Sequence, residues 1–183
     1  MEHSTIIGGF GGQGILFAGQ LLAQAALLEG HDVSWMPSYG PEMRGGTASC
    51  TVVIADHPIG SPIVDIADSV VALNPPSMAK YESFLTPGGL LVLNDSLIEA
   101  APGRTDIELL LLPCTELALA AGHDRLVSVA ALGGLLARRP VVSVESLHEA
   151  MAELVGRHHP ELLEADAVAF AGGYDRAKLL VLT

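Results

Sequence analysis

A glycine-rich turn between an apolar strand and a long apolar helix constrains this chain more than any other feature. The stretch STIIGGFGGQGILFAGQ, residues 4–20, holds six glycines and fits G-x-G-x-x-G when it is read from Gly9. Glycines permit positive φ and let a ligand approach the backbone, and the amino end of the following helix favours a phosphate or carboxylate. The pattern predicts a ligand-binding turn, although the same glycines would also suit a tight, closely packed turn without a ligand.

Strand and helix patterns alternate along the rest of the chain. Short apolar, β-branched runs predict six strands, at 4–8, 32–36, 47–55, 69–73, 90–94 and 107–112. Helical patterns lie at 13–29, 75–84, 115–121 and 127–137, and further helices are predicted from about residue 143. This alternation predicts one α/β domain over residues 1–183, a Rossmann-like three-layer α/β/α sandwich with an open, mostly parallel sheet.

Ligands of such sheets collect at the carboxyl ends of the strands, which selects two loops, residues 8–14 and 37–46. If the first two strands are neighbours, both loops share one edge of the sheet. The second loop, SYGPEMRGG, places Glu42 and Arg44 among glycines. A guanidinium held in a glycine-rich turn of an acidic chain suits bidentate capture of a carboxylate or phosphate. An internal Glu42–Arg44 ion pair that braces the loop is the equal alternative.

A nicotinamide or flavin dinucleotide would require more than the glycine spacing. Such sites need an acidic residue at the end of the second strand, where it binds the ribose hydroxyls. The available acid, Asp32, falls at the start of that strand, and the predicted far end carries Met36 and Pro37. The sequence therefore argues against a standard NAD site.

Composition excludes several other classes of protein. The formal net charge of −12 disfavours nonspecific binding to nucleic acid or to an anionic membrane. No apolar run is long enough to span a bilayer, and the chain opens on a strand pattern without a basic leader, which predicts a cytoplasmic protein. The two cysteines, Cys50 and Cys114, are too few for a Cys₄ cluster and are predicted to be buried free thiols. No Cys/His spacing suggests a zinc site, so no metal site is predicted.

GFGGQG, followed about two dozen residues later by SYGPEMRGG, resembles the gamma subunit, or gamma domain, of the 2-oxoacid:ferredoxin oxidoreductases. The segments VALNPPSMAKYESFLTPGGLLVLNDSLI and ELALAAGHDRLVSVAALGGLLA are similar to later parts of that family, which extends the resemblance over most of residues 6–137. The form YGPEMRGG is most similar to 2-oxoglutarate-type subunits, with branched-chain and pyruvate enzymes as alternatives. One departure is Ser128, where relatives commonly carry Asn.

The resemblance implies a division of labour between subunits. Enzymes of this family decarboxylate a 2-oxoacid on thiamine diphosphate, pass electrons through iron–sulfur clusters to ferredoxin, and transfer the acyl group to coenzyme A. This chain lacks a recognisable thiamine-diphosphate and Mg²⁺ motif, so alpha and beta subunits would hold thiamine diphosphate and Mg. The clusters would lie on the beta subunit or on a ferredoxin-like delta subunit. The apolar helix faces are also compatible with self-association of the isolated chain.

The resemblance also implies which residues of this chain form its site. The first loop would present backbone amides and one polar side chain to coenzyme A, as the co-substrate, through Gly9, Gly11, Gly12, Gln13 and Gly14. In the second loop Arg44 would meet an anionic group, and the shape would be set by Tyr39, Gly40, Glu42, Gly45 and Gly46. No catalytic residue is predicted in this chain. The alternatives are a stand-alone NAD(P) oxidoreductase and a noncatalytic scaffold whose glycine loops only pack against partner subunits.

Overall fold

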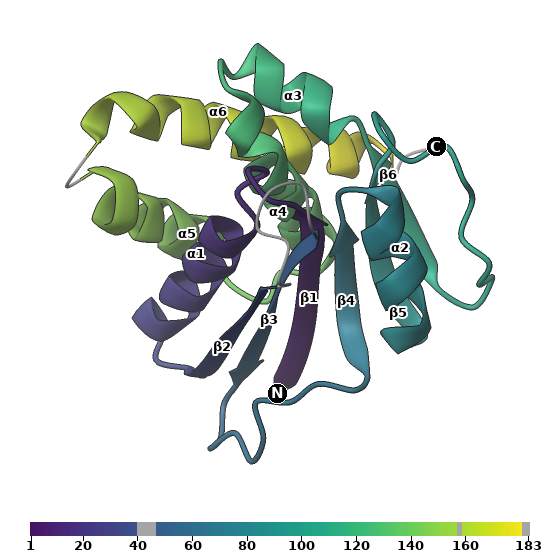
Figure 1. Ribbon diagram of the computed structural model, residues 1–183. Coiled ribbons are helices and arrows are strands. Elements are labelled where there is room, and N and C mark those ends of the chain that lie inside the picture. The colour runs from purple at the N-terminus through teal and green to yellow at the C-terminus, as the bar shows by residue number, and fades with distance from the viewer. Residues whose placement is uncertain (40–46, 157–158, 181–183) are drawn as a thin grey trace.

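The computed structural model of the protein describes residues 1–39, 47–156 and 159–180. Its sheet has six strands in the order β2-β3-β1-β4-β5-β6 (Figure 1). The strands are β1 (Glu2–Phe10), β2 (Asp32–Tyr39), β3 (Thr47–Ala55), β4 (Ala67–Ala72), β5 (Leu85–Asn94) and β6 (Glu108–Leu112). Strands β1, β4, β5 and β6 pair in parallel, whereas β3 is antiparallel to both β1 and β2. The predicted mostly parallel α/β sheet is confirmed, and its mixed character comes from the reversal of β3.

The position of β3 corrects one expectation about the two loops. Strands β1 and β2 are not neighbours, because β3 lies between them. Two antiparallel pairings in succession nevertheless give β1 and β2 the same direction. The register aligns Tyr39, Ala48 and Gly9 in one row across the three strands. Both loops therefore leave the same edge of the sheet, two strand spacings or about 10 Å apart.

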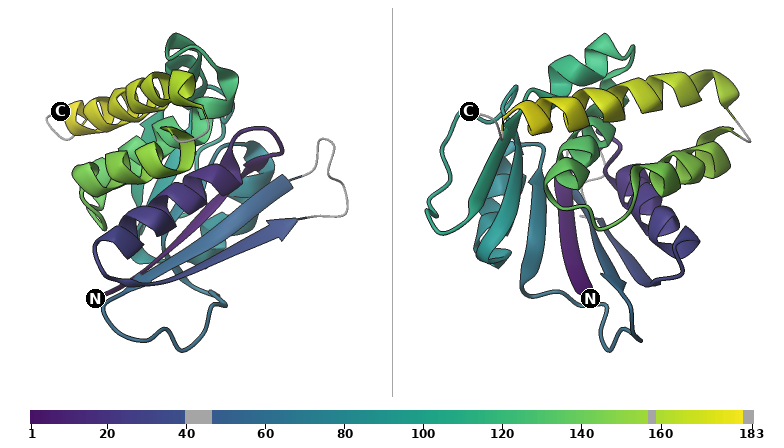
Figure 2. Two further views of the ribbon diagram at one scale, coloured as in Figure 1. Left: turned by 90° about the vertical axis from the view of Figure 1, so that its left-hand side faces the viewer. Right: turned by 180° about the vertical axis from the view of Figure 1, so that it is seen from behind.

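Helices cover both faces of the sheet, but unequally. On one face, called here the helix-rich face, lie α1 (Ile15–Leu28), α3 (Cys114–Ala120), α4 (Val127–Arg138), α5 (Val144–Met151) and α6 (Pro160–Leu179). Figure 2 shows α5 and α6 on the same side of the sheet as α1. The other face, called the α2 face, carries α2 (Pro75–Tyr81) and the 3₁₀ turn Glu82–Phe84. The predicted C-terminal helices are confirmed, with a π-helical segment, Ala152–Gly156, after α5.

Two hydrophobic clusters follow from the alternation of side chains along the strands. The larger lies under the helix-rich face and includes Ile7, Val52, Leu90 and Leu110. The smaller cluster lies under α2 and includes the residues next to these along the strands, such as Ile6 and Leu91. Cys50 and Cys114 are free and buried in the larger cluster, as predicted.

Strand β5 begins earlier than the sequence predicts. Residues 86–89, TPGG, lie between the predicted helix 75–84 and the predicted strand 90–94, yet they belong to β5. The pairing with β4 shifts register between Ala67, opposite Leu85, and Ser69, opposite Leu90. Gly88 takes a φ of 77° in this irregular stretch, which explains why a turn-like sequence occurs within a strand. Among the described residues, no helix combines the length and apolar character that crossing a membrane requires.

Candidate functional site

The glycine turn connects the carboxyl end of β1 to the start of α1 and is braced by its own polar groups. The backbone N–H of Phe10 donates to Oε1 of Gln13 at 2.7 Å, and the N–H of Gln13 donates back to the Phe10 carbonyl at 3.2 Å. Gly12 and Gly14 have φ values of 97° and 76°, in the left-handed region that favours glycine. The oxygen of the Gln13 amide is therefore engaged within the turn.

Two of the five glycine-turn residues predicted for ligand binding have a clear packing role. A Cβ at Gly9 would lie 2.5 Å from Oε1 of Gln13 and 2.6 Å from Cδ1 of Ile15. A Cβ at Gly14 would lie 2.6 Å from the backbone oxygen of Arg125. A side chain at Gly14 would meet backbone that cannot move aside, and one at Gly9 would require the side chains of Gln13 and Ile15 to shift.

Gly11 and Gly12 are the exposed part of the turn. Both are solvent-exposed, and a Cβ at Gly12 would meet no atom within 4 Å. Beyond them α1 begins with Gly14 as its N-cap, without a side-chain cap and without an acidic residue in the first turn. The first amides of a helix have no acceptor within the helix, so this end of α1 presents donors suited to a phosphate or carboxylate.

The start of α4 also contributes to the turn, a contact that the sequence analysis did not identify. Ser128 is buried, and its Oγ lies 2.7 Å from the position of a Cβ at Gly14. This hydroxyl has no hydrogen-bond partner among the described residues. Ser128, the position at which relatives commonly carry Asn, therefore packs against the glycine turn. A larger Asn side chain would have less room there. Only the tertiary contact between α4 and the turn reveals this, because some 110 residues separate them in the chain.

On the opposite side of the turn, polar residues at the start of α2 were also missed. Asn74 follows β4 and caps α2, where its Oδ1 accepts the N–H of Ser77 at 2.8 Å. Both residues are buried, and Nδ2 of Asn74 and Oγ of Ser77 have no partner among the described residues. A Cβ at Gly8 would stand 3.0 Å from the Ser77 side chain, so this glycine allows α2 to approach β1. The Asn-Pro-Pro-Ser capping pattern was the available sequence signal.

The second predicted loop lies largely outside the described residues. Tyr39, the first of its predicted site residues, ends β2 at the same sheet edge as the glycine turn. The remaining predicted residues, Gly40, Glu42, Arg44, Gly45 and Gly46, lie outside the described ranges. The choice between anion capture by Arg44 and an internal Glu42–Arg44 pair therefore stays open.

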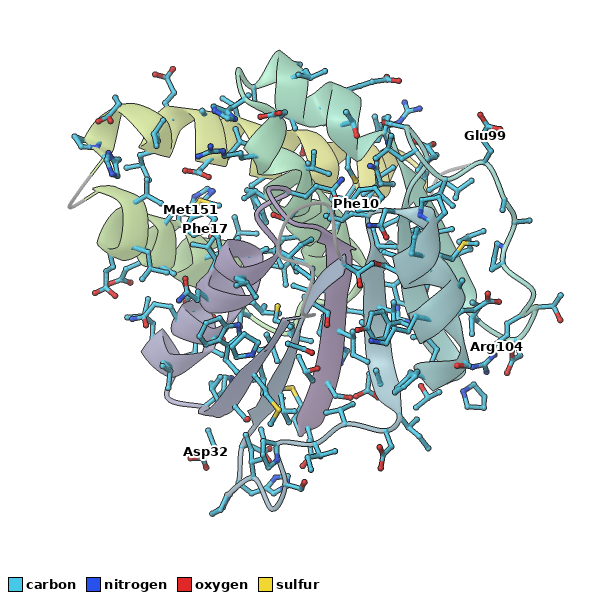
Figure 3. The ribbon with its side chains drawn as sticks, viewed as in Figure 1. Phe10, Phe17, Asp32, Glu99, Arg104 and Met151 are labelled. Carbon is cyan, nitrogen blue, oxygen red and sulfur yellow. The ribbon has the colours of Figure 1, made fainter. Side chains whose placement is uncertain are left out.

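The geometry adds a second argument against a standard dinucleotide site. Asp32 is exposed at the start of β2, and Figure 3 shows it at the end of the sheet opposite to Phe10. Met36 and Pro37 are interior residues of β2, not its end as predicted, because the strand continues to Tyr39. The end of β2 is separated from the glycine turn by β3. In a standard dinucleotide-binding fold the acid-bearing strand is the direct neighbour of the first strand.

Two hollows in the described surface lie away from the glycine turn. A groove of about 380 Å³ at the start of β2 is lined by Asp32, Ser34, Pro58 and Pro62, among others. A second, of about 260 Å³, lies between α1 and β2 and includes Gln24 and Trp35. The described residues contain no group of three or more His, Cys, Asp or Glu side chains that could hold a metal ion. Burial raises the pKa of the Cys50 thiol to about 12, so it carries no reactive thiolate at neutral pH.

The fold and the glycine turn first define a class of protein. Its members are α/β domains with a glycine-rich turn at the carboxyl edge of a mixed sheet. The model of the pyruvate ferredoxin/flavodoxin oxidoreductase family matches residues 4–176 of this chain. The chain is 33% identical over 183 residues to the 2-oxoglutarate synthase subunit KorC of Methanocaldococcus jannaschii. That match covers 98% of this chain and 96% of KorC. This chain therefore belongs to the pyruvate ferredoxin/flavodoxin oxidoreductase family, which confirms the resemblance carried by its glycine loops.

Two further similarities show in which kinds of polypeptide this domain occurs among relatives. The ketoisovalerate oxidoreductase subunit VorA of Methanothermobacter marburgensis is 44% identical over 136 residues, which are 74% of this chain. The match spans only 28% of VorA, so the unit is one part of a longer polypeptide there. The crystal structure of the keto/oxoacid ferredoxin oxidoreductase gamma subunit from Geobacter sulfurreducens superimposes with a TM-score of 0.86 at 28% identity, covering 97% of each chain.

Proposed function

We propose that this chain is the gamma subunit of a 2-oxoacid:ferredoxin oxidoreductase that converts a 2-oxoacid to its acyl-CoA and reduces ferredoxin. The observation that carries this proposal is the end-to-end match with KorC, a subunit of a 2-oxoglutarate synthase. The gamma-subunit fold from Geobacter sulfurreducens supports it independently. Alpha and beta subunits, with the iron–sulfur clusters on beta or a ferredoxin-like delta subunit, would supply the thiamine diphosphate chemistry and electron transfer. We expect the assembly to be cytoplasmic.

The contribution of this chain itself would be a binding surface for coenzyme A that is formed mainly by backbone atoms. Gly11 and Gly12 are exposed beside the uncapped amino end of α1, which suits the phosphates of that co-substrate. Gly9 and Gly14 would keep the turn closed by packing, and Gln13 would brace it from inside. Arg44 would supply the positive charge. A pure scaffold would need the same packing glycines but no exposed amides.

The proposed 2-oxoacid is 2-oxoglutarate, because KorC matches over the full chain. VorA is more similar over a shorter stretch, so a branched-chain 2-oxoacid such as ketoisovalerate is the alternative, followed by pyruvate. The test is purification of the chain with its companion subunits, followed by viologen reduction with each of the three 2-oxoacids in the presence of coenzyme A. We expect 2-oxoglutarate to give the highest kcat/KM. A higher value with ketoisovalerate would assign the chain to the branched-chain type.

Coenzyme A binding at the glycine turn can be tested with a matched pair of variants. Gly12 and Gly30 both have positive φ, at 97° and 80°, and a Cβ at either would meet no atom within 4 Å. Alanine should therefore strain the two positions alike, although only Gly12 lies in the turn. In the assembled enzyme we expect Gly12→Ala and Arg44→Ala to raise the KM for coenzyme A and Gly30→Ala to leave it unchanged. Equal KM values for all four proteins would favour the scaffold alternative, and tight NADH binding by the isolated chain would favour a dinucleotide enzyme.

A further inference from the structure

The outer strand β6 exposes two leucines on the α2 face of the sheet. Leu109 and Leu111 stand beside Leu91 and Leu93 of β5 in the parallel register, so these side chains share one face. Leu91 and Leu93 are fully buried under α2. Leu109 and Leu111 are 40% and 44% exposed. We call these two residues the β6 strip.

The strip is bare because a crossover helix is missing. The connection from β4 to β5 contains α2, which covers the sheet, whereas the connection from β5 to β6, residues 95–107, contains no helix. Parallel strands are normally joined by a helix that packs on the sheet and buries the face of the strand it leads to. Figure 1 shows this connection as an extended loop beside β6. In architectures with a crossover helix, a helix therefore fills the space that lies over the β6 strip.

The connection beside the strip, residues 95–107, is acidic. The N–H of Asp95 donates to the Leu112 carbonyl at 3.0 Å, which fixes Asp95 at the carboxyl end of β6. The only base of the connection, Arg104, is paired with Asp106. Asp95 and Glu99 are exposed, and Figure 3 shows Glu99 directed away from the sheet. A second copy of this chain, with its own net charge of −12, would meet these carboxylates with like charge.

We propose that the β6 strip receives an amphipathic helix of a companion subunit, with lysine or arginine beside its apolar face. This inference rests on the proposed function, because it requires an assembly with other subunits. It is consistent with VorA, in which the matched part makes up 28% of a longer polypeptide. Such a helix would bury Leu109 and Leu111 in the position of the missing crossover helix and would place its bases near Asp95 and Glu99.

Thiol labelling provides a direct test, because both natural cysteines are buried. A cysteine in place of Leu111 would be the accessible thiol of the free chain, and Leu119→Cys on α3, where Leu119 is 59% exposed, is the control. The rate of maleimide labelling is measured on this chain by mass, first alone and then in the purified assembly. We expect labelling of the Leu111→Cys variant to slow at least tenfold on assembly, and that of the Leu119→Cys variant to stay within twofold.

A second pair of variants tests the energy of the contact. Leu111→Glu should reduce co-purification with the companion subunits at least tenfold, whereas Leu119→Glu should not, provided that circular dichroism shows both chains folded. Unchanged labelling of the Leu111→Cys variant in a purified assembly would overturn this inference and leave the proposed function intact. Protection already present in the isolated chain, together with a dimer in sedimentation, would show that a second copy occupies the strip and would also overturn it. If no companion subunit co-purifies with the natural chain, the proposed function itself fails.

Discussion

The two faces of the sheet are built on different principles. On the helix-rich face α1 and α4 cover the strands, the other described helices of that face pack around them, and Leu110 of β6 is 3% exposed. On the α2 face one short helix covers the centre, and the next residue of the same strand, Leu111, is 44% exposed. Burial on the first face supplies most of the hydrophobic stabilisation of the isolated chain. The second face leaves apolar surface, which in a family of multi-subunit enzymes is where further chains can bind.

Close helix packing makes the helix-rich face compact. Helix α6 crosses α4 where both carry glycine, at Gly173 and Gly133. A Cβ at Gly173 would lie 1.8 Å from the backbone oxygen of Ala130, and one at Gly133 would lie 2.1 Å from that of Phe170. Backbone cannot yield as a flexible side chain can, so these contacts depend on the absence of side chains. The α2 face has a milder version of this contact, where Gly8 meets side chains of α2 at 3.0 Å.

The largest expected effect is therefore on the helix-rich face. Gly173→Ala should force α6 away from α4 and lower the free energy of unfolding by about 3 kcal/mol or more, which corresponds to a fall in Tm of about 10 °C. The neighbouring Gly172 is the matched control, because its Cβ would meet only Cδ2 of Leu117, at 3.2 Å. Gly172→Ala should change stability by less than about 1 kcal/mol, since improved helix propensity offsets the contact. Equal Tm values for the two variants, by circular dichroism, would show that the α4–α6 crossing is not rigid.

Much of this architecture could be predicted from the sequence. β3 is rich in β-branched residues and α4 is a continuous run of small and apolar residues, and the strand-helix alternation indicated a mostly parallel sheet. The place of β3 between β1 and β2 could not be predicted, because strand order depends on long-range pairing that leaves no local pattern. The early start of β5 was missed for a different reason. Its Pro-Gly-Gly run has the composition of a turn and forms an irregular stretch, but Leu85 and Leu90 on either side of it pair with β4 and keep it inside the strand.

The candidate site shows the same division between local and long-range information. The glycine turn was predicted from spacing alone, and its positive φ values are a local property of Gly12 and Gly14. Spacing could not separate glycines that pack, such as Gly14, from an exposed glycine such as Gly12. That distinction depends on neighbours such as Arg125, which lie far along the chain. The turn could therefore be located from the sequence, whereas the packing of its individual glycines could not.

A buried carboxylate on the helix-rich face gives the second-largest effect, with the opposite sign. Asp166 of α6 is 3% exposed, and desolvation raises its pKa to about 6. Since the folded chain binds this proton more tightly than the unfolded chain, Asp166 makes the fold progressively less stable as the pH rises from about 4 to about 6. Asp166→Asn should therefore increase the free energy of unfolding by about 2 kcal/mol at pH 7.5.

The pH profile separates this effect from a change in packing. Below pH 4 both side chains are neutral, and the Tm difference between Asp166→Asn and the natural chain should vanish. A difference that persists at pH 3.5 would contradict the desolvation argument. Glu161→Gln, at an exposed residue near the start of the same helix, is the control and should show no gain at pH 7.5.

On the α2 face, the hydrogen bond that ties α2 to β3 should have a smaller effect. The hydroxyl of Tyr81 donates to Oγ of Ser49 at 2.8 Å, and both residues are buried. Tyr81→Phe removes this bond and leaves the Ser49 hydroxyl without it, which should cost about 1 kcal/mol. Urea unfolding would measure the loss, with Tyr174→Phe as a control on α6. A change below about 0.3 kcal/mol would mean that α2 is held by its apolar contacts alone.

The smallest effect is expected at the β6 strip, and it bears most directly on the difference between the faces. Leu111→Ala removes a side chain that is nearly half exposed, so the free energy of unfolding of the isolated chain should change by no more than about 0.5 kcal/mol. Leu110→Ala, one residue away and buried under the helix-rich face, should cost about 3 kcal/mol. The same pair measured in the assembled enzyme should behave differently, because a helix bound over the strip would make Leu111 a core residue there. Leu111→Ala could also leave the free energy of unfolding nearly unchanged both in the isolated chain and in the assembled enzyme. That result would mean that the exposed part of the α2 face has no structural partner.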